Sequence, residues 1–252
     1  MNSLKRIIII GLILALPFLI GASDEGKAKQ SDEQAKKDQK AKQVTSVDKP
    51  VYKPPLRGSP AGRVGGGTRG ATERESFSLQ VLAPDHVGLT IQDQPNLYGY
   101  VSKPIPHPVE LTVVERNAVK PVVENVIQGP DRGGIQAIRL ADYGVHLRRN
   151  VPYKWFVTLV VDADHRSKDI LAGGIITSVD PPLSLPAKLK AADALKAPSI
   201  YAEEGLWYDA IGSISQMIDA SPGNMELRKQ RASLLEQVGL LEVAAFENQQ
   251  TR

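Results

Sequence analysis

A glycine-rich stretch flanked by arginines, RVGGGTRG at residues 63–70, is the first feature whose residue types could do chemistry. Such a loop binds phosphate when it follows a buried strand and opens a helix, and its Walker form ends in Lys followed by Ser or Thr. Here a charged, proline-rich region precedes the stretch, a strand is expected after it, and Gly70 and Ala71 stand at its end. We therefore predict a turn-like passage of chain and no nucleotide or other cofactor.

A second segment, DADHRSKD at residues 162–169, gathers side chains that bind metal ions: Asp162, Asp164, His165 and Asp169. Clustered carboxylates suit Ca²⁺, and the imidazole suits a transition metal. The segment lacks the glycine and the terminal glutamate of a calcium loop, and polar residues between two strands are usually solvated. We predict no metal site here, and weak binding at these four side chains stays open.

Catalytic groups are not arranged in any familiar pattern. Ser167 lies in a turn and not in the strained strand-to-helix elbow of a nucleophilic serine. Glu203 and Glu204 are neighbours near a helix end, so their side chains point apart. The other histidines fall in separate expected loops: His86, His107 and His146. We therefore expect a protein that is not an enzyme.

The residues from 76 to 186 read as short strands. Apolar runs such as FSLQVLAP, VELTVVE and WFVTLVV are divided by Pro, Gly and Asp turns. About eight such runs predict an antiparallel Ig-like β-sandwich. In WFVTLVV, Trp155 and Phe156 lie on opposite faces and both faces are apolar, so we expect one face against the second sheet and a separate cover on the other.

The residues from 187 to 247 have a helical period. Ile211, Ile214 and Ile218 form one apolar stripe, and a second stripe follows Pro222. The segment YAEEGLWYDAIGSISQMIDASPGN resembles a tetratricopeptide repeat, which predicts a helical hairpin. A single repeat cannot bury its own apolar face, so the hairpin must pack on the sandwich or on a partner. We expect the sandwich, through the second face of the Trp155 strand.

Aromatic side chains are the candidate contact residues. Trp207 and Tyr208 stand at the turn between the repeat's helices, where they are either packed core or anchors for a partner protein. A sugar ligand would need exposed aromatics, for which Tyr98, Tyr100 and Tyr143 are the candidates. Period-two spacing places Tyr98 and Tyr100 on one face of a strand.

The N-terminal residues predict export. Lys5 and Arg6 precede an apolar run from Ile7 to Ile20 that closes on small residues, the layout of a secretory signal peptide over residues 1–23. So short a run favours cleavage over retention as an anchor. Cleavage removes two cations from a formal net charge of +3, so the basic composition does not point to nucleic acid. The chain has no cysteine, so its stability must come from a packed core.

Between leader and strands, residues 24–75 predict a disordered linker. The first part, DEGKAKQSDEQAKKDQKAKQ, mixes both charge signs and has almost no large apolar residue, so it cannot bury a core. Prolines then stiffen the chain up to the glycine cluster.

Several segments occur in an order that resembles the domain of unknown function 928 family of exported bacterial proteins: GGGTRG, LAPDHVGLTIQDQPNLYGYV, VELTVVE, VPYKWFVTLVVDADHRSKDI, YAEEGLWYDA and LLEQVGL. The resemblance covers about residues 57–245. It implies that the glycines let the chain pass closely against the sandwich. Family members typically carry two cysteines where this sequence has Ala71 and Val161, so a bridge between tail and sheet is absent here.

Together these patterns predict an exported, non-enzymatic protein of the periplasm or cell envelope that acts as an interaction or assembly module. Its expected partners are envelope proteins, with no nucleic acid and no membrane span after the leader is cleaved. The alternative is a β-sandwich that binds an envelope polysaccharide or a small ligand.

Overall fold

The computed structural model describes residues 49–55, 62–67 and 77–251, which belong to one compact unit. Its strands are β1 (Gly66–Gly67), β2 (Ser78–Val81), β3 (Gly88–Thr90), β4 (Asn96–Val101), β5 (Val109–Glu115), β6 (Val123–Ile127), β7 (Gly134–Arg139), β8 (Pro152–Leu159) and β9 (Ile170–Ser178). Five α-helices follow: α2 (Leu185–Ala191), α3 (Ala197–Glu203), α4 (Trp207–Ala220), α5 (Met225–Gln237) and α6 (Leu241–Gln249). Short 3₁₀ turns lie at η1 (Leu140–Tyr143), η2 (Arg166–Lys168) and η3 (Ala194–Lys196).

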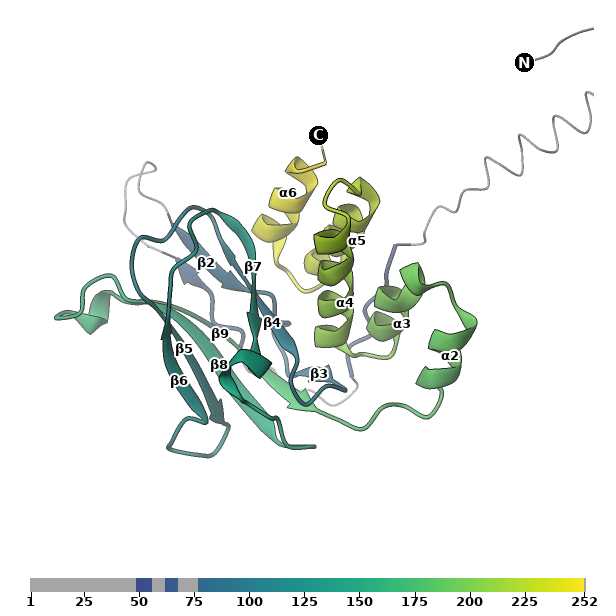
Figure 1. Cartoon of the computed structure of the whole chain (residues 1–252), viewed down its shortest axis with the longest axis horizontal. Coiled ribbons are helices and arrows are strands. Elements are labelled where there is room, and N and C mark those ends of the chain that lie inside the picture. Colours follow the sequence, from purple (N-terminus) through teal and green to yellow (C-terminus); the bar gives the residue numbers. More distant parts are fainter. Residues whose placement is uncertain (1–48, 56–61, 68–76, 252) are drawn as a thin grey trace, which may run out of the picture. The chain divides into compact units, whose positions relative to one another are not determined.

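The strands form two sheets. One has the order β1-β2-β4-β7 and the other the order β3-β9-β8-β5-β6, and the helices come after them in the chain (Figure 1). The expected order of β-sheets followed by C-terminal helices is therefore confirmed. The expectation of purely antiparallel pairing is wrong for one pair of strands, because β3 runs parallel to β9. These two strands are far apart in sequence, so no short hairpin dictates their direction.

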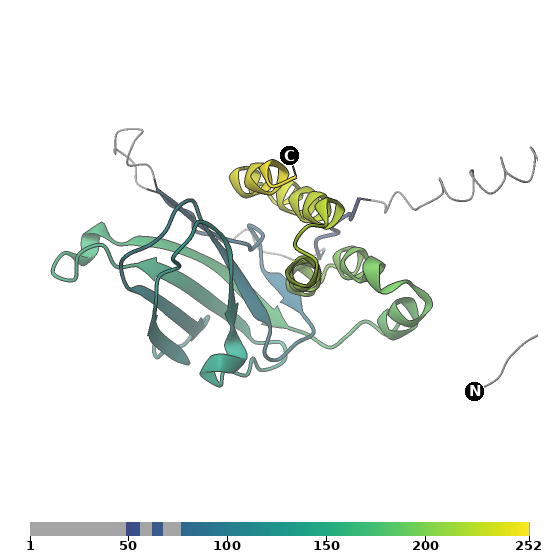
Figure 2. The ribbon, with the colours of Figure 1, turned by 45° about the horizontal axis from the view of Figure 1, so that its top comes forward.

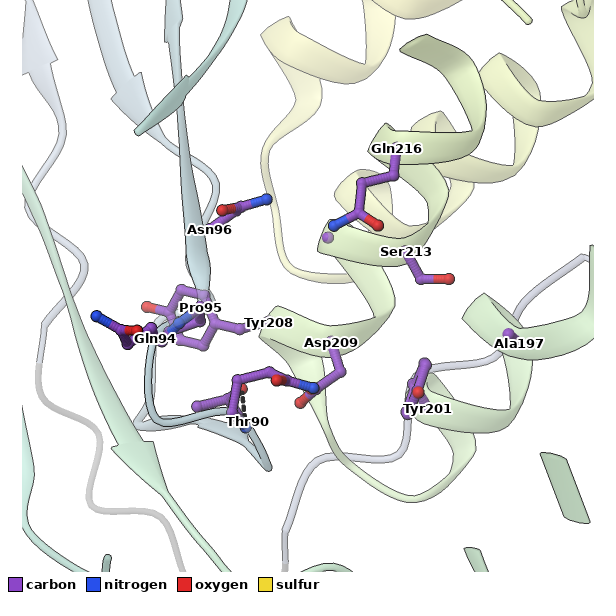
Figure 3. A pocket seen from close by; sticks show the side chains of 12 residues that line it. Thr90, Gln94, Pro95, Asn96, Ala197, Tyr201, Tyr208, Asp209, Ser213 and Gln216 are labelled. Atoms are coloured by element: carbon purple, nitrogen blue, oxygen red, sulfur yellow. Dashed lines mark hydrogen bonds between the residues drawn. The ribbon is translucent and has the colours of Figure 1, made fainter. Parts of the chain in front are cut away.

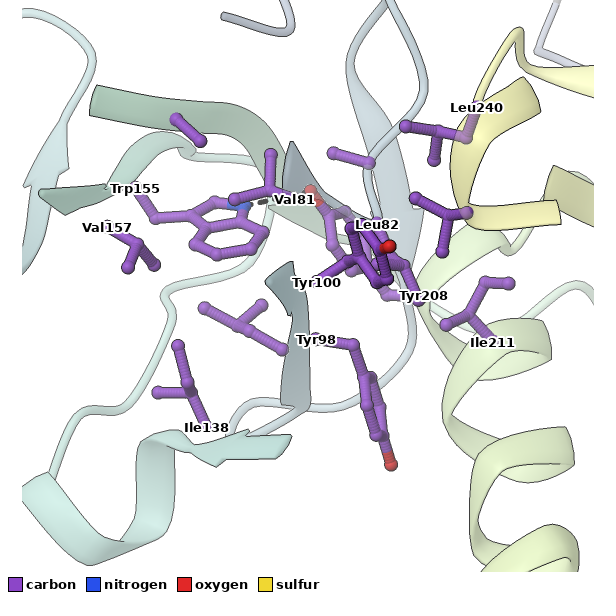
Figure 4. Packing of buried hydrophobic residues seen from close by; sticks show 14 of the residues in the cluster. Val81, Leu82, Tyr98, Tyr100, Ile138, Trp155, Val157, Tyr208, Ile211 and Leu240 are labelled. Atoms are coloured by element: carbon purple, nitrogen blue, oxygen red, sulfur yellow. Dashed lines mark hydrogen bonds between the residues drawn. The ribbon is translucent and has the colours of Figure 1, made fainter. Parts of the chain in front are cut away.

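Sheets and helices share one hydrophobic core. Val81 of β2, Trp155 of β8 and Ile211 of α4 belong to the same buried cluster (Figure 4). Figure 2 shows the helices gathered on one side of the two sheets. Helix α4 packs against β3 and β4. The helices are thus covered by the sheets, as the isoleucine stripe required.

The face that covers the helices differs from the one expected. Trp155 faces the core, while the ring of Phe156 lies on the other face of β8, over Gly173 of β9. A Cβ atom at Gly173 would stand 2.3 Å from Cδ1 of Phe156. Helix α4 packs instead toward β4, whose Tyr100 ring meets Phe246 of α6 with 5.3 Å between centroids. The Phe156 face is therefore not the counterpart of the helices.

The helix ends follow local chemistry. Asn224 caps α5, because its side-chain oxygen accepts hydrogen bonds from the amides of Glu226 and Leu227. Gly239 adopts a φ of 74° between α5 and α6, a conformation that favours glycine. Among the helices of the described residues, none combines the length and apolar character needed to cross a membrane.

The predicted disordered linker, residues 24–75, is wrong for its two described parts. Tyr52 is only 7% exposed, and its ring meets that of Trp207 with 4.9 Å between centroids. The side chain of Gln237 accepts a hydrogen bond from the amide of Tyr52 and donates one to the carbonyl of Pro50, both at 2.8 Å. Neighbouring prolines lower the entropic cost of ordering this segment, and one aromatic ring supplies the apolar surface. Residues 24–48 and the leader, residues 1–23, lie outside the described residues.

Candidate functional site

Trp207 and Tyr208 lie at the start of α4 and are core residues, so the hypothesis that they contact a partner is wrong for this structure. Nε1 of Trp207 donates to the carbonyl of Leu82 at 2.8 Å. The hydroxyl of Tyr208 accepts from Nε1 of Trp155 at 2.9 Å and donates to the carbonyl of Ile175 at 3.1 Å (Figure 4). Both side chains are fully buried, and their polar atoms form hydrogen bonds. These bonds link α4 to the chain of both sheets.

Close approach at this junction depends on a glycine. A Cβ atom at Gly174 of β9 would stand 2.5 Å from Cβ of Ala83 and 3.4 Å from the hydroxyl oxygen of Tyr208. The neighbouring Gly173 leaves room for Phe156 on the opposite face. The two adjacent glycines of β9, Gly173 and Gly174, therefore leave space for one aromatic ring on each face of the strand.

A polar pocket of about 400 Å³ lies beside this junction, between the β3–β4 segment and helices α3 and α4 (Figure 3). Its walls carry amide, hydroxyl and carboxyl side chains, with few apolar groups. The lining residues are Thr90, Gln92, Gln94, Pro95, Asn96, Ala197, Tyr201, Tyr208, Asp209, Gly212, Ser213 and Gln216. We refer to this set as the polar pocket.

Asp209 is the buried carboxyl group of the polar pocket. It is 7% exposed, and its Oδ2 accepts a hydrogen bond from the amide of Ile91 at 3.0 Å. Burial raises the pKa of Asp209 from 3.8 to about 6, although bonds from Ile91 and Thr90 favour the charged form. The carboxyl group holds the chain after β3 against the first turn of α4. Sequence reasoning missed Asp209, and its place directly after Trp207 and Tyr208 was the available signal.

Two of the carboxylates considered as metal ligands, those of Asp162 and Asp169, form ion pairs with basic side chains instead. Oδ2 of Asp162 lies 2.8 Å from Nδ1 of His165 and 2.9 Å from Nζ of Lys168, and these bonds lower the pKa of Asp162. Oδ2 of Asp169 pairs with Arg166 at 2.6 Å. Asp164 is exposed, and its backbone amide donates a hydrogen bond to Oδ1 of Asp162. Within the described ranges, no group of three or more metal-ligating side chains comes together.

The tyrosines expected on one face of a strand are on one face of β4, but they are buried. Tyr98 and Tyr100 are 4% and 5% exposed. Tyr143 is half-buried against the core. Tyr98 and Tyr100 therefore do not offer the open ring that stacking on a sugar requires.

The segment RVGGGTRG is a short edge strand over its described part. Gly66 and Gly67 pair with β2, and Val64 bridges Gly173 of β9. Nη1 of Arg63 donates to the carbonyls of Ala83 and Val238, both at 2.9 Å. The close approach implied for its glycines is not found at Gly65, where nothing lies within 4 Å of a Cβ position.

The Phe156 face of the larger sheet carries an apolar hollow of about 300 Å³. Its lining includes the apolar residues Val64, Phe156 and Ile175 and the basic residues Arg116 and Lys154. Neither cation forms an ion pair with another described residue. We refer to these five residues as the Phe156 hollow.

Comparisons with known proteins identify the family. The family model described as Domain of Unknown Function (DUF928) matches residues 64–247, so the chain belongs to this family. A multi-domain immunophilin from Arabidopsis thaliana is similar at 7% identity over 76% of this chain and 98% of that one, with a TM-score of 0.17, too low to support any argument. No curated protein matches the chain.

Proposed function

We propose that this chain is an exported, non-enzymatic protein of the periplasm or cell envelope whose folded region is an interaction or assembly module for a protein partner. The leader pattern in residues 1–23 supports export. Membership of the family supports a common fold and names no activity.

The observation that carries this proposal is the Phe156 hollow. An apolar depression whose lining includes two cations without an ion pair among the described residues is complementary to an apolar side chain flanked by carboxylates. Val64 is 43% exposed there, and Val126 of the edge strand β6 is 69% exposed on the same sheet. We therefore propose a protein segment with a large apolar residue next to Asp or Glu as the occupant.

We also propose that the sheets form an Ig-like sandwich and that the first helices form a tetratricopeptide-like hairpin. The two sheets share their core as the layers of an Ig-like sandwich do, with β3 and β9 as the parallel exception. Helices α3 and α4 pack on each other as in a tetratricopeptide-like hairpin, and Pro198 lies in the first turn of α3, where proline is tolerated.

Charge reversal tests the interaction. The mature chain, with a photo-crosslinking residue at Val64, is compared with its Lys154→Glu and Arg116→Glu variants in an envelope fraction. We expect one crosslinked protein with the parent chain and its loss in both variants. The matched control is Lys190→Glu, because Lys190 is exposed on α2 and lies outside the hollow.

Two further outcomes bear on the proposal. Competition by a synthetic peptide with phenylalanine between two glutamates is expected to reduce the crosslink, whereas the same peptide with two lysines leaves it unchanged. Equal crosslinking by the parent chain and both charge-reversed variants would contradict the assignment of the hollow.

Export has its own test. Replacing Lys5 and Arg6 by glutamate is expected to trap the precursor in the cytoplasm, since the leader needs a positively charged start. Export at the normal rate would show that the leader is misread.

A further inference from the structure

The polar pocket is lined by groups that can both donate and accept hydrogen bonds. Four amide side chains contribute to it, from the β3–β4 segment and α4: Gln92, Gln94, Asn96 and Gln216. Asn96 and Gln216 stand on opposite walls (Figure 3). The side chains of Gln94, Ser213 and Gln216 have no hydrogen-bond partner among the described residues, so their polar atoms are free for a ligand.

Charge excludes one class of ligand from the pocket. No Lys, Arg or His occurs among its lining residues, and its single ionisable acid is the buried Asp209. An anionic ligand would therefore bring a negative charge to a site without a cation, which is unfavourable. A neutral ligand meets no such penalty.

The pocket also has an apolar platform. Tyr201 on α3 is partly buried against the hydrophobic core and lines the pocket together with Pro95 and Ala197. A sugar ring places C–H bonds on its faces and hydroxyl groups around its rim. An aromatic ring and several amide side chains in one lining match both, because a ring packs on C–H bonds and amides, like hydroxyls, both donate and accept hydrogen bonds.

We propose that the polar pocket is a binding site for a neutral carbohydrate unit, with Tyr201 as the stacking platform and Gln94, Ser213 and Gln216 as partners for its hydroxyl groups. The site is separate from the Phe156 hollow and does not depend on it. Its volume of about 400 Å³ lies within the range of small-ligand sites. Asp209 acts as a positioning residue, since it holds Ile91 and thereby the pocket wall against α4.

The probes are neutral oligosaccharides: cellotetraose, maltotetraose and chitotetraose. Tetragalacturonate supplies an anionic sugar and tetra-alanine a neutral peptide. Binding to the mature chain is followed by saturation-transfer NMR and calorimetry. We expect saturable binding of at least one neutral sugar and none of tetragalacturonate or tetra-alanine. Preference for tetra-alanine or tetragalacturonate would overturn the proposal, as would the absence of binding by every neutral sugar.

Variants locate the site. Tyr201→Ala and Gln216→Ala are each expected to weaken binding of the neutral sugar about tenfold. Gln128→Ala is the control, because Gln128 is an exposed amide outside the pocket. Thermal unfolding verifies that each variant is folded, and the exposed Gln216 keeps the test valid if Tyr201→Ala does not fold. Unchanged affinity in a folded Gln216→Ala and a folded Tyr201→Ala would refute the site.

The two binding proposals fail separately. Lys154→Glu is expected to leave sugar binding unchanged, and Gln216→Ala to leave the protein crosslink unchanged. Loss of both activities in a single folded variant would contradict the separation of the sites.

Discussion

The buried Asp209 carboxyl group makes the stability of the fold depend on pH. Its pKa is raised from 3.8 to about 6 by burial, so the folded state binds the proton more tightly than the unfolded state does. At pH values between these two, unfolding releases a proton. The contribution of Asp209 to the free energy of unfolding is therefore greatest at low pH and is lost as pH rises through about 6.

The size of the effect follows from the shift. Each pKa unit corresponds to 1.36 kcal/mol, so a rise of roughly two units changes the free energy of unfolding by about 3 kcal/mol between pH 3.5 and pH 7. An Asp209→Asn variant cannot titrate and retains a side-chain oxygen for the amide of Ile91. Its free energy of unfolding is expected to lack this component.

Urea unfolding at a series of pH values is the assay. The quantity compared is the difference in free energy of unfolding between the parent chain and Asp209→Asn, which cancels the titration of all other groups. We expect the parent to lose about 3 kcal/mol relative to the variant as pH rises. Asp219→Asn serves as control, because Asp219 is an exposed carboxyl on the same helix. A flat difference for Asp209→Asn would refute the assignment of a raised pKa.

Other perturbations test the packing by urea unfolding. Tyr52→Ala is expected to cost about 3 kcal/mol because Tyr52 is buried, whereas Val51→Ala, at an exposed neighbour, costs little; equal effects would contradict the ordered N-terminal segment. Gly174→Ala is expected to cost about 1 to 3 kcal/mol through its clash with Ala83, while Gly212→Ala, with open space and a helical site, is neutral or stabilising. A chain truncated before α2 loses the burial of Ile211, Ile214 and Ile218, which contributes about 5 to 9 kcal/mol to the free energy of unfolding. The truncated chain is expected to bind a hydrophobic dye, and an unchanged melting temperature would refute the shared core.

Local patterns in the sequence were sufficient to predict the elements. The alternation around Trp155 predicted a strand with two apolar faces, and the isoleucine stripe from Ile211 predicted a helix that needs a cover. Both are confirmed, because strand and helix periods depend only on residues close in the chain. The family resemblance is confirmed as well, since its motifs are short and ordered along the sequence.

Long-range packing decided what local patterns could not. The sequence contains the helices and both faces of the Trp155 strand, but only the folded chain shows that α4 packs toward β4 and that Tyr98 and Tyr100 are covered. Tyr52 was predicted as linker because its neighbours are polar and proline-rich, and two of its partners, Trp207 of α4 and Gln237 of α5, are more than a hundred residues away. The polar pocket likewise joins Thr90 to Asp209. The packing of α4, the burial of Tyr52 and the polar pocket share one physical reason. Burial depends on surfaces brought together from distant segments, whereas sequence periodicity shows only which face of a segment is apolar.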